Sequence, residues 1–508
     1  WVCAPRRLRG RATMVAMGCA SPLRLSIALP SGRLLLDNEE VVSDSTIFQL
    51  QYQAGKLFGK PLQGLICPVG TVLDTCARVH ELNLKDGDCL GAFVATPPRV
   101  FATKQAFAAL SRTGSVRTWG GTGQGGDSTP VQEQLSEGVR DIFASCRAFA
   151  ALKTDGSVVT WGDPRSGGDS SAVRSQLTGG VVQVCPCRRA FAALKQDGTV
   201  VTWGECSSGG DSSGVQQKLS GQEVVALYST EEAFAAVTLG GTVVAWGDPV
   251  AGGDSSPVQE ALASGVQRIL STSYSFAALK ADGSVVTWGV GTCGGDSSSV
   301  SGQLAGGVKE IYATGRAFAA IKADGSVVAW GSVSDGGNSA VTPGMEERLR
   351  SGVRRIFANS RAFAAVKEDG SVVTWGYWPE GGDSSKVEPL LTGGVVEVTY
   401  TSRAFAALKA DGSVVTWGDG HYGGDACSVR ESLAQDVLHV YASDRAFAAL
   451  KADGSVVTWG NWTCGGDCSA VQEQLKRDVL HISSTNHAFA AVKSDDTIVA
   501  WGETTSGG

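Results

Sequence analysis

The feature that most constrains this chain is a Trp-Gly pair that recurs through most of its length at an almost constant spacing. Successive pairs lie 42, 43 or 45 residues apart. So constant a period indicates a modular fold in which each unit buries its apolar surface against its neighbours. Residues 99–508 are therefore expected to form ten tandem repeats, the last of them incomplete. The repeat tryptophans, expected to be structural core residues, are Trp119, Trp161, Trp203, Trp246, Trp288, Trp330, Trp375, Trp417, Trp459 and Trp501.

One repeat shows what each unit folds into. Residues 148–162 read AFAALKTDGSVVTWG, and their two apolar runs flank Asp155-Gly156, a pair that favours a two-residue hairpin turn. The first run is apolar without alternation, so its strand should be covered on both faces. A Gly-rich loop and a short helical turn follow each hairpin, and residues 138–144 read as a third strand that leads into the next one. The fold class is therefore mainly β, with small sheets in a β-propeller or a related stacked array.

This pattern, GVxxIxA followed by AFAALKxDGSVVTWG, resembles the regulator-of-chromosome-condensation repeat superfamily. Within it, the short three-stranded blades of the beta-lactamase-inhibitor-protein-II type are the most similar. The resemblance implies a propeller whose faces bind proteins and whose usual blade number is seven. Ten copies leave three arrangements open: one ring plus part of another, a larger ring, or an open stack. A WD-type propeller has a similar period, but its repeats end in Trp-Asp.

One departure from the family bears on activity. The longer, chromatin-associated members carry Gly-Gln-Leu-Gly after the Trp-Gly pair, whereas this chain carries Gly-Gly-Asp-Ser-Ser. Guanine-nucleotide exchange is therefore not expected of it.

Residues 22–95 do not follow the repeat and predict a separate α+β domain. Residues 23–29 and 33–36 read as a hairpin, and a helix capped by Asp44 or Ser45 has its apolar residues on one face. Apolar runs at 62–66 and 71–73 follow, and then a turn and a final strand within residues 86–94. This ββαββ order resembles a ubiquitin-like β-grasp domain. No diglycine follows the last strand, so an interaction module is expected and conjugation to substrates is not. The apolar face of the helix comprises Ile47, Leu50, Ala54, Leu57 and Phe58.

Residues 1–21 are interpreted as a leader or a gene-model artefact. The segment contains four arginines, and no apolar core of a signal peptide follows them. No apolar run in the chain approaches the roughly 20 residues of a membrane-spanning helix.

Charge and cysteine usage restrict the partners and the compartment. The formal charge is −7, which argues against a broad surface for nucleic acid or anionic membranes. The thirteen cysteines fall at different points of the repeat, so they predict neither a disulfide framework nor a zinc site. The expected compartment is a reducing one, the cytoplasm or the nucleus.

A recurring carboxylate is the most tempting candidate for a metal site. A ring of such groups could bind cations, but calcium needs six to eight converging oxygens, and each repeat supplies one carboxylate. The favoured interpretation is that each carboxylate bonds the backbone of its own turn, and no metal or cofactor is predicted. The residues are Asp127, Asp169, Asp211, Asp254, Asp296, Asp383, Asp425 and Asp467, with Asn338 in the remaining position.

A second recurrence is basic. One set of arginines precedes the apolar strand, and a set of lysines ends it, so stacked copies should form two rows that could share a rim. The rows are interpreted either as a contact for an acidic protein or as solvated strand ends that prevent aggregation. Changing Arg361, Arg403 and Arg445 together to Ser is expected to weaken partner binding and to leave the fold intact. The arginines are Arg147, Arg189, Arg316, Arg361, Arg403 and Arg445, and the lysines are Lys153, Lys195, Lys280, Lys322, Lys367, Lys409 and Lys451.

No catalytic motif is recognisable. The five histidines, His80, His421, His439, His481 and His487, belong to no nucleophile or metal motif, and no phosphate-binding loop is present. The chain is not expected to be an enzyme.

The predicted function is that of a non-catalytic protein–protein interaction scaffold, with the repeat array and the ubiquitin-like module as its contact surfaces. The expected partner is a protein, either an acidic one or one of the ubiquitin pathway. Two alternatives stay open. The chain could be a fragment of a larger HECT-type ubiquitin ligase, or it could be a carbohydrate-binding propeller.

A single repeat is expected not to fold by itself, because its apolar strands are buried only by adjacent units. The peptide of residues 139–177 should therefore give the far-ultraviolet circular dichroism of an unfolded chain. A cooperative thermal transition of this peptide would contradict the stacked arrangement.

Overall fold

The computed structural model describes residues 23–28, 34–41, 50, 64–66, 79, 82, 84–85, 88–93, 99–111, 113–338, 344–495 and 497–504. The chain divides into two compact units, Trp1–Thr96 and Pro97–Gly508. Among the described helices, none has the length and hydropathy to cross a membrane. The segment interpreted as a leader, residues 1–21, lies outside the described residues.

The N-terminal unit contains a four-stranded mixed sheet in the order β2-β1-β4-β3. The two central strands, β1 and β4, run parallel, and the outer pairs are antiparallel. Leu25, Ile27 and Leu90 from the central strands pack with Leu50 and Val79 in one buried cluster. The strands are β1 (Leu23–Ala28), β2 (Leu34–Val41), β3 (Gly64–Ile66) and β4 (Cys89–Phe93).

Two predicted elements of this unit cannot be placed. Leu50 is helical and 2% exposed, whereas the rest of the predicted helix lies outside the described residues, and so does the apolar run at 71–73. The observed sheet differs from the predicted hairpin in length, because β2 continues to Val41.

The second unit consists of ten three-stranded antiparallel sheets, here called blades 1 to 10 in chain order. Each blade is continuous in sequence, and its first and third strands both pair with the strand between them. The first strands are β5 (Arg99–Ala102), β8 (Val139–Ala144), β11 (Val181–Pro186), β14 (Val224–Ser229), β17 (Val266–Ser271), β20 (Val308–Ala313), β23 (Val353–Ala358), β26 (Val395–Tyr400), β29 (Val437–Ala442) and β32 (Val479–Ser484). The second strands are β6 (Ala106–Leu110), β9 (Ala148–Lys153), β12 (Ala190–Lys195), β15 (Ala233–Thr238), β18 (Ser275–Lys280), β21 (Ala317–Lys322), β24 (Ala362–Lys367), β27 (Ala404–Lys409), β30 (Ala446–Lys451) and β33 (Ala488–Lys493). The third strands are β7 (Val116–Gly120), β10 (Val158–Gly162), β13 (Val200–Gly204), β16 (Val243–Gly247), β19 (Val285–Gly289), β22 (Val327–Gly331), β25 (Val372–Gly376), β28 (Val414–Gly418), β31 (Val456–Gly460) and β34 (Ile498–Gly502).

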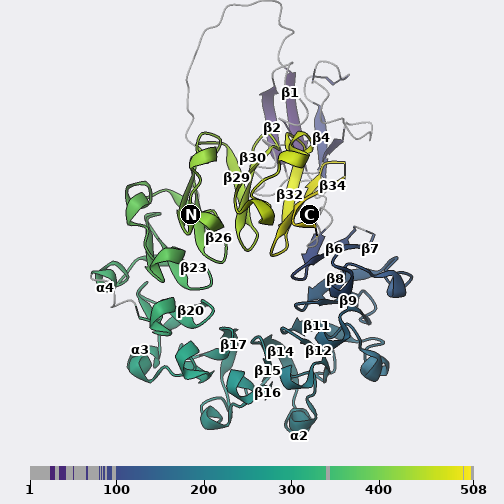
Figure 1. Cartoon of the computed structure of the whole chain (residues 1–508), viewed down its shortest axis with the longest axis vertical. Helices are drawn as coiled ribbons and strands as arrows, with labels where there is room; N and C mark the ends of the chain where they lie inside the picture. The colour runs from purple at the N-terminus through teal and green to yellow at the C-terminus, as the bar shows by residue number, and fades with distance from the viewer. Residues whose placement is uncertain are drawn as a thin grey trace, which may run out of the picture. The chain divides into compact units, whose positions relative to one another are not determined.

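The blades of this unit follow one another around a ring, and the first strand of each blade is innermost (Figure 1). In blade 4, for example, β14, β15 and β16 lie at increasing distance from the centre of the ring. The ring closes between its two ends, because Phe107 of blade 1 packs against Ala488 and Ala490 of blade 10. Of the arrangements that the sequence left open, the structure is therefore a single closed ring of ten blades.

Local sequence explains why each blade forms. Asp155 accepts the Ser157 N–H at 2.8 Å, and Gly156 adopts a φ of 79°, so the Asp-Gly pair makes the hairpin turn that the sequence predicts. All residues of β9 except its terminal lysine are buried, as expected of a strand covered on both faces.

Turns link each outer strand to the next blade and complete the packing between blades. A first turn follows the outer strand at η2 (Thr122–Gln124), η4 (Pro164–Ser166), η6 (Cys206–Ser208), η8 (Pro249–Gly253), η10 (Gly291–Cys293), η12 (Val333–Asp335), η14 (Trp378–Glu380), η16 (Gly420–Tyr422) and η18 (Trp462–Cys464). A second turn follows at η3 (Thr129–Val131), η5 (Ser171–Gln176), η7 (Ser213–Val215), η9 (Ser256–Val258), η11 (Ser298–Val300), η15 (Ser385–Leu390), η17 (Cys427–Val429) and η19 (Ser469–Leu475), with α2 (Gln216–Leu219), α3 (Ser301–Leu304) and α4 (Met345–Arg348) as short helices in three blades. Each link buries one leucine: Leu135, Leu177, Leu219, Leu262, Leu304, Leu349, Leu391, Leu433 and Leu475.

The repeat tryptophan joins its own blade to the preceding one. In blade 2, the Trp161 ring stacks on Phe149 with centroids 5.2 Å apart, and its Nε1 donates to the Gly125 carbonyl of blade 1 at 3.0 Å. Gly125 has a φ of 98°, and a Cβ there would lie 2.5 Å from Cδ2 of Phe149. A Phe, a Trp and a Gly thus form the contact between blades 1 and 2. The same indole bond recurs at Trp203, Trp246, Trp288, Trp330, Trp375, Trp417, Trp459 and Trp501.

Replacing the tryptophan of one contact should destabilise the ring strongly. Trp288 is 3% exposed, so Trp288→Ala is expected to lower the free energy of unfolding by about 3–5 kcal/mol. Trp288→Phe retains a ring against Phe276 but leaves the Gly252 carbonyl without its donor, and the expected loss is about 1–2 kcal/mol. Denaturant titration measures both losses. Asp296→Ala in the adjacent loop is the control and should cost much less, so an equal loss for Asp296→Ala and Trp288→Ala would contradict this role.

Candidate functional site

The turns at the start of each middle strand and at the end of each outer strand lie on one face of the ring. In blade 2, Ala148 at the start of β9 pairs with Gly162 at the end of β10. The Ser145 hydroxyl links the two turns, because it donates to the Ser166 carbonyl at 2.8 Å and accepts the Ala148 N–H at 3.0 Å. All six predicted arginines belong to these turns, so this surface is called the arginine face.

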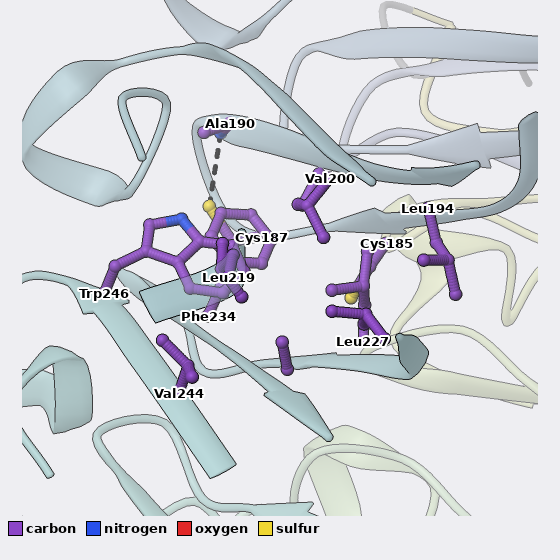
Figure 2. Packing of buried hydrophobic residues seen from close by; sticks show 13 residues of the cluster. Cys185, Cys187, Ala190, Leu194, Val200, Leu219, Leu227, Phe234, Val244 and Trp246 are labelled. Atoms are coloured by element: carbon purple, nitrogen blue, oxygen red, sulfur yellow. Dashed lines mark hydrogen bonds between the residues drawn. The ribbon is translucent and has the colours of Figure 1, made fainter. Parts of the chain in front are cut away.

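A small polar side chain performs this linking role in nine of the blades. Besides Ser145, these side chains are Thr103, Cys187, Thr230, Thr272, Thr314, Asn359, Thr401 and Ser443, and Thr485 accepts the Ala488 N–H of its own turn at 2.9 Å. Figure 2 shows the blade 3 example, where the Cys187 sulfur accepts the Ala190 N–H at 3.2 Å. Burial raises the pKa of Cys187 to about 12 and that of neighbouring Cys185 to about 11, so both remain thiols at neutral pH.

Backbone hydrogen bonds also connect the turns of the arginine face from blade to blade. The Cys146 N–H donates to the Arg188 carbonyl at 3.1 Å, and the Arg188 N–H donates to the Glu231 carbonyl at 2.9 Å. The same bond recurs from Lys104 in blade 1 to Asp444 in blade 9. The face is therefore a rigid platform from which side chains project.

The arginine row does not form a uniformly positive surface. Arg147 lies 4.0 Å from Asp163, and Arg445 lies 3.4 Å from Asp444. Carboxylates on the same face therefore neutralise part of the positive charge of the arginine row. No ion pair involves the side chain of Arg316, which lies in the described part of the chain.

Two buried carboxylates alter the expected role of the row. Arg361 pairs with Asp335 at 2.5 Å, and Arg403 pairs with Glu380 at 3.4 Å. Asp335 is 2% exposed and Glu380 is 5% exposed, so each depends on its arginine as a partner. Burial raises the pKa of Glu380, although Arg403 and Arg361 act in the opposite direction. The sequence analysis did not anticipate these contacts, and replacing Arg361 or Arg403 is therefore expected to cost stability.

The lysine row lies on the opposite face, because each lysine ends the strand that an arginine precedes. The structure thus excludes a shared rim for the two rows. The Lys153 Nζ donates to the Gln134 carbonyl at 3.0 Å, and Lys280, Lys322 and Lys367 make the equivalent bond at 2.9–3.2 Å. These lysines close the C-terminal end of the turn before each blade, which is a structural role.

Each loop carboxylate binds the backbone of its own turn. Asp296 accepts the Ser298 N–H at 2.9 Å, and this hydrogen bond lowers its pKa. The same bond from the residue two positions later is present at Asp127, Asp169, Asp211, Asp254, Asp383, Asp425 and Asp467. Within the described residues, no three His, Cys, Asp or Glu side chains come together as metal ligands.

Aromatic side chains gather among three of the arginines, in blades 7 to 9. The Arg361 guanidinium stacks over Tyr377 at 3.9 Å from the ring centroid. Tyr422 lies under both Arg403 and Arg445, at 4.7 and 5.3 Å. Together with Trp378 and Trp462, these five residues form what is called the aromatic–arginine patch.

The two tryptophans of the patch are exposed, unlike the buried repeat tryptophans. Trp378 is 71% exposed and Trp462 is 74% exposed. Both lie three residues after a repeat tryptophan, at a position that varies widely among the blades. In the other blades it holds Thr122, Pro164, Cys206, Pro249, Gly291, Val333, Gly420 and Thr504. The sequence analysis missed the patch, although two tryptophans outside the repeat register were a usable signal.

Comparisons with known proteins do not add to the functional assignment. No protein-family model matches the chain, and no curated protein matches it in sequence. Its fold is similar to that of human WBSCR16, with 14% identity, a TM-score of 0.32, and coverage of 47% of this chain and 77% of that one. It is also similar to Prp20p from Saccharomyces cerevisiae, with 16% identity, a TM-score of 0.31, and coverage of 56% of this chain and 83% of that one. The computationally designed Ika8 protein is similar as well, with 15% identity, a TM-score of 0.29, and coverage of 64% of this chain and 96% of that one. Prp20 is yeast RCC1, a member of the repeat family that the sequence resembles.

Removing one partner of the buried Glu380 should make stability depend on pH. Arg403→Ser is expected to lower the free energy of unfolding by about 1–2 kcal/mol at neutral pH. The pKa of Glu380 is raised in the folded state above its ordinary value of 4.5. Its stabilising contribution is therefore complete below that ordinary value and is lost as pH rises through the raised pKa. The loss of Arg403 raises this pKa further, so the deficit should shrink as the solution is acidified towards that range.

Urea unfolding of the wild type and the variant across this pH range measures the deficit. Arg316→Ser is the matched control, because Arg316 occupies the same repeat position without an ion pair, and its effect should be small at every pH. A deficit of Arg403→Ser that grows on acidification would contradict the role assigned to Glu380.

Proposed function

We propose that this protein is a non-catalytic scaffold that binds protein partners on the arginine face. One observation carries the proposal: the blades share a nearly identical core, whereas the position of this face that lies three residues after the repeat tryptophan differs widely from blade to blade. A rigid platform that presents different side chains at equivalent positions suits the recognition of a large, irregular surface, which is what a folded protein offers.

We further propose that the N-terminal unit is a ubiquitin-like module that acts as a second contact. The parallel central pair of strands in the order β2-β1-β4-β3 supports a β-grasp topology. Neither the structure nor the comparisons support the alternative of a ubiquitin-ligase fragment.

Charge reversal on the arginine face tests whether this face binds protein partners or is only exposed to solvent. The full chain with Arg147→Glu, Arg189→Glu and Arg316→Glu is expected to recover its cellular partners about tenfold less well than the wild type in quantitative affinity capture. None of these three arginines pairs with a buried carboxylate in the described part of the chain, so the fold should be retained.

The matched control is Lys195→Glu with Lys409→Glu on the opposite face. Neither ammonium group has a hydrogen bond or an ion pair in the described part of the chain. This control should capture partners as the wild type does. Equal recovery by both variants, with unchanged melting temperatures, would contradict a partner site on the arginine face.

A further inference from the structure

The aromatic–arginine patch is the place where this ring departs most from its own repeat. Equivalent positions in the other blades hold small or aliphatic residues, so the two exposed indoles are not part of the folding pattern. Exposing two large apolar side chains to water carries a cost that the fold does not require. Trp, Tyr and Arg are also the residues that contribute most to binding energy at protein interfaces.

The patch is held in place before any partner binds. Arg361 and Arg403 are each fixed on one side by a carboxylate and on the other by a tyrosine ring. The turns that carry Tyr422 and Trp462 are capped, because the Asp419 side chain accepts the His421 N–H at 2.9 Å and the Asn461 side chain accepts the Thr463 N–H at 3.0 Å. A ligand therefore meets ordered rings, and little side-chain entropy is lost on binding.

Charge balance restricts the class of ligand. The three arginines of the patch are opposed by Asp335, Glu380, Asp419 and Asp444, which lie within 4.0 Å of them. An acidic peptide would compete with carboxylates that are already in place, so attraction between net charges cannot be the main source of affinity.

The remaining hydrogen-bonding groups of the patch are mainly donors. In the described chain, neither the Trp378 nor the Trp462 indole N–H has an acceptor, whereas the nearby carboxylates already accept from guanidinium groups. The rings occur in three consecutive blades, with the arginines between them. The patch thus offers apolar faces and N–H donors along an extended path.

We propose that the aromatic–arginine patch binds a proline-rich segment of a partner protein in an extended polyproline II conformation. Such a segment presents apolar rings and backbone carbonyl acceptors, it lacks N–H donors at its prolines, and its stiffness reduces the entropy lost on binding. These properties complement exposed indoles and guanidinium donors. The proposal rests on the proposed function and specifies one ligand class for the same face.

Selection from a phage library of random dodecapeptides on the immobilised full chain tests this inference. Proline-rich peptides should be enriched, and a synthetic peptide of the enriched sequence should bind about tenfold or more weakly to the variant Trp378→Ala, Trp462→Ala. Both side chains are exposed, so the melting temperature of the variant should stay unchanged. The matched control is Val333→Ala, which removes an apolar side chain that is 56% exposed at the same repeat position in blade 6, and it should bind like the wild type.

Three results would overturn the inference: enriched peptides without proline, enriched acidic peptides, or equal binding by the double tryptophan variant. If no peptide is enriched and the protein instead binds glycans on an array, with binding lost in the double tryptophan variant, the patch is a carbohydrate site. If the tryptophan variant has no effect while charge reversal of the arginine face still abolishes partner capture, the ligand class is wrong and the scaffold function stands.

Discussion

The contact among a phenylalanine, a tryptophan and a glycine of the preceding blade is the interaction on which the ring depends. From Trp161 onward, each repeat tryptophan covers the phenylalanine of its own blade and donates a hydrogen bond across the interface, as Trp161 does to Gly125. No other residue fits at the glycine position, because a side chain there would overlap the phenylalanine ring. This contact recurs at nine interfaces between consecutive blades, and Phe107, Ala488 and Ala490 close the ring between blades 1 and 10, so that every blade has two neighbours.

The sequence predicted the local structure well, because hairpin turns and apolar runs are encoded within a few residues. The Asp155-Gly156 turn, the apolar middle strand and the third strand from residue 139 all lie where the pattern places them. The closed ring was not predictable, because closure depends on the small angle between blades and on a contact between Phe107 and Ala488, which are far apart in the chain. The ion pairs of Asp335 and Glu380 were missed for the same reason, since their arginines belong to the next blade.

Different positions of the repeat hold the blades together and face the solvent, which explains how such a ring can bind a specific partner. Residues that hold the blades together vary little, because each contact leaves little room for substitution. The turn after each repeat tryptophan is under no such constraint, and that is where the exposed Trp378 and Trp462 occur. Folding and recognition are thus assigned to different positions of the same repeat, so the surface can change without loss of the ring.

The central claim, a single closed ring of ten blades, is tested most directly by electron microscopy of the purified full chain. Class averages along the ring axis should show one closed ring with ten lobes around a central opening. An open arc, or a ring with seven lobes and three further blades outside it, would contradict the account.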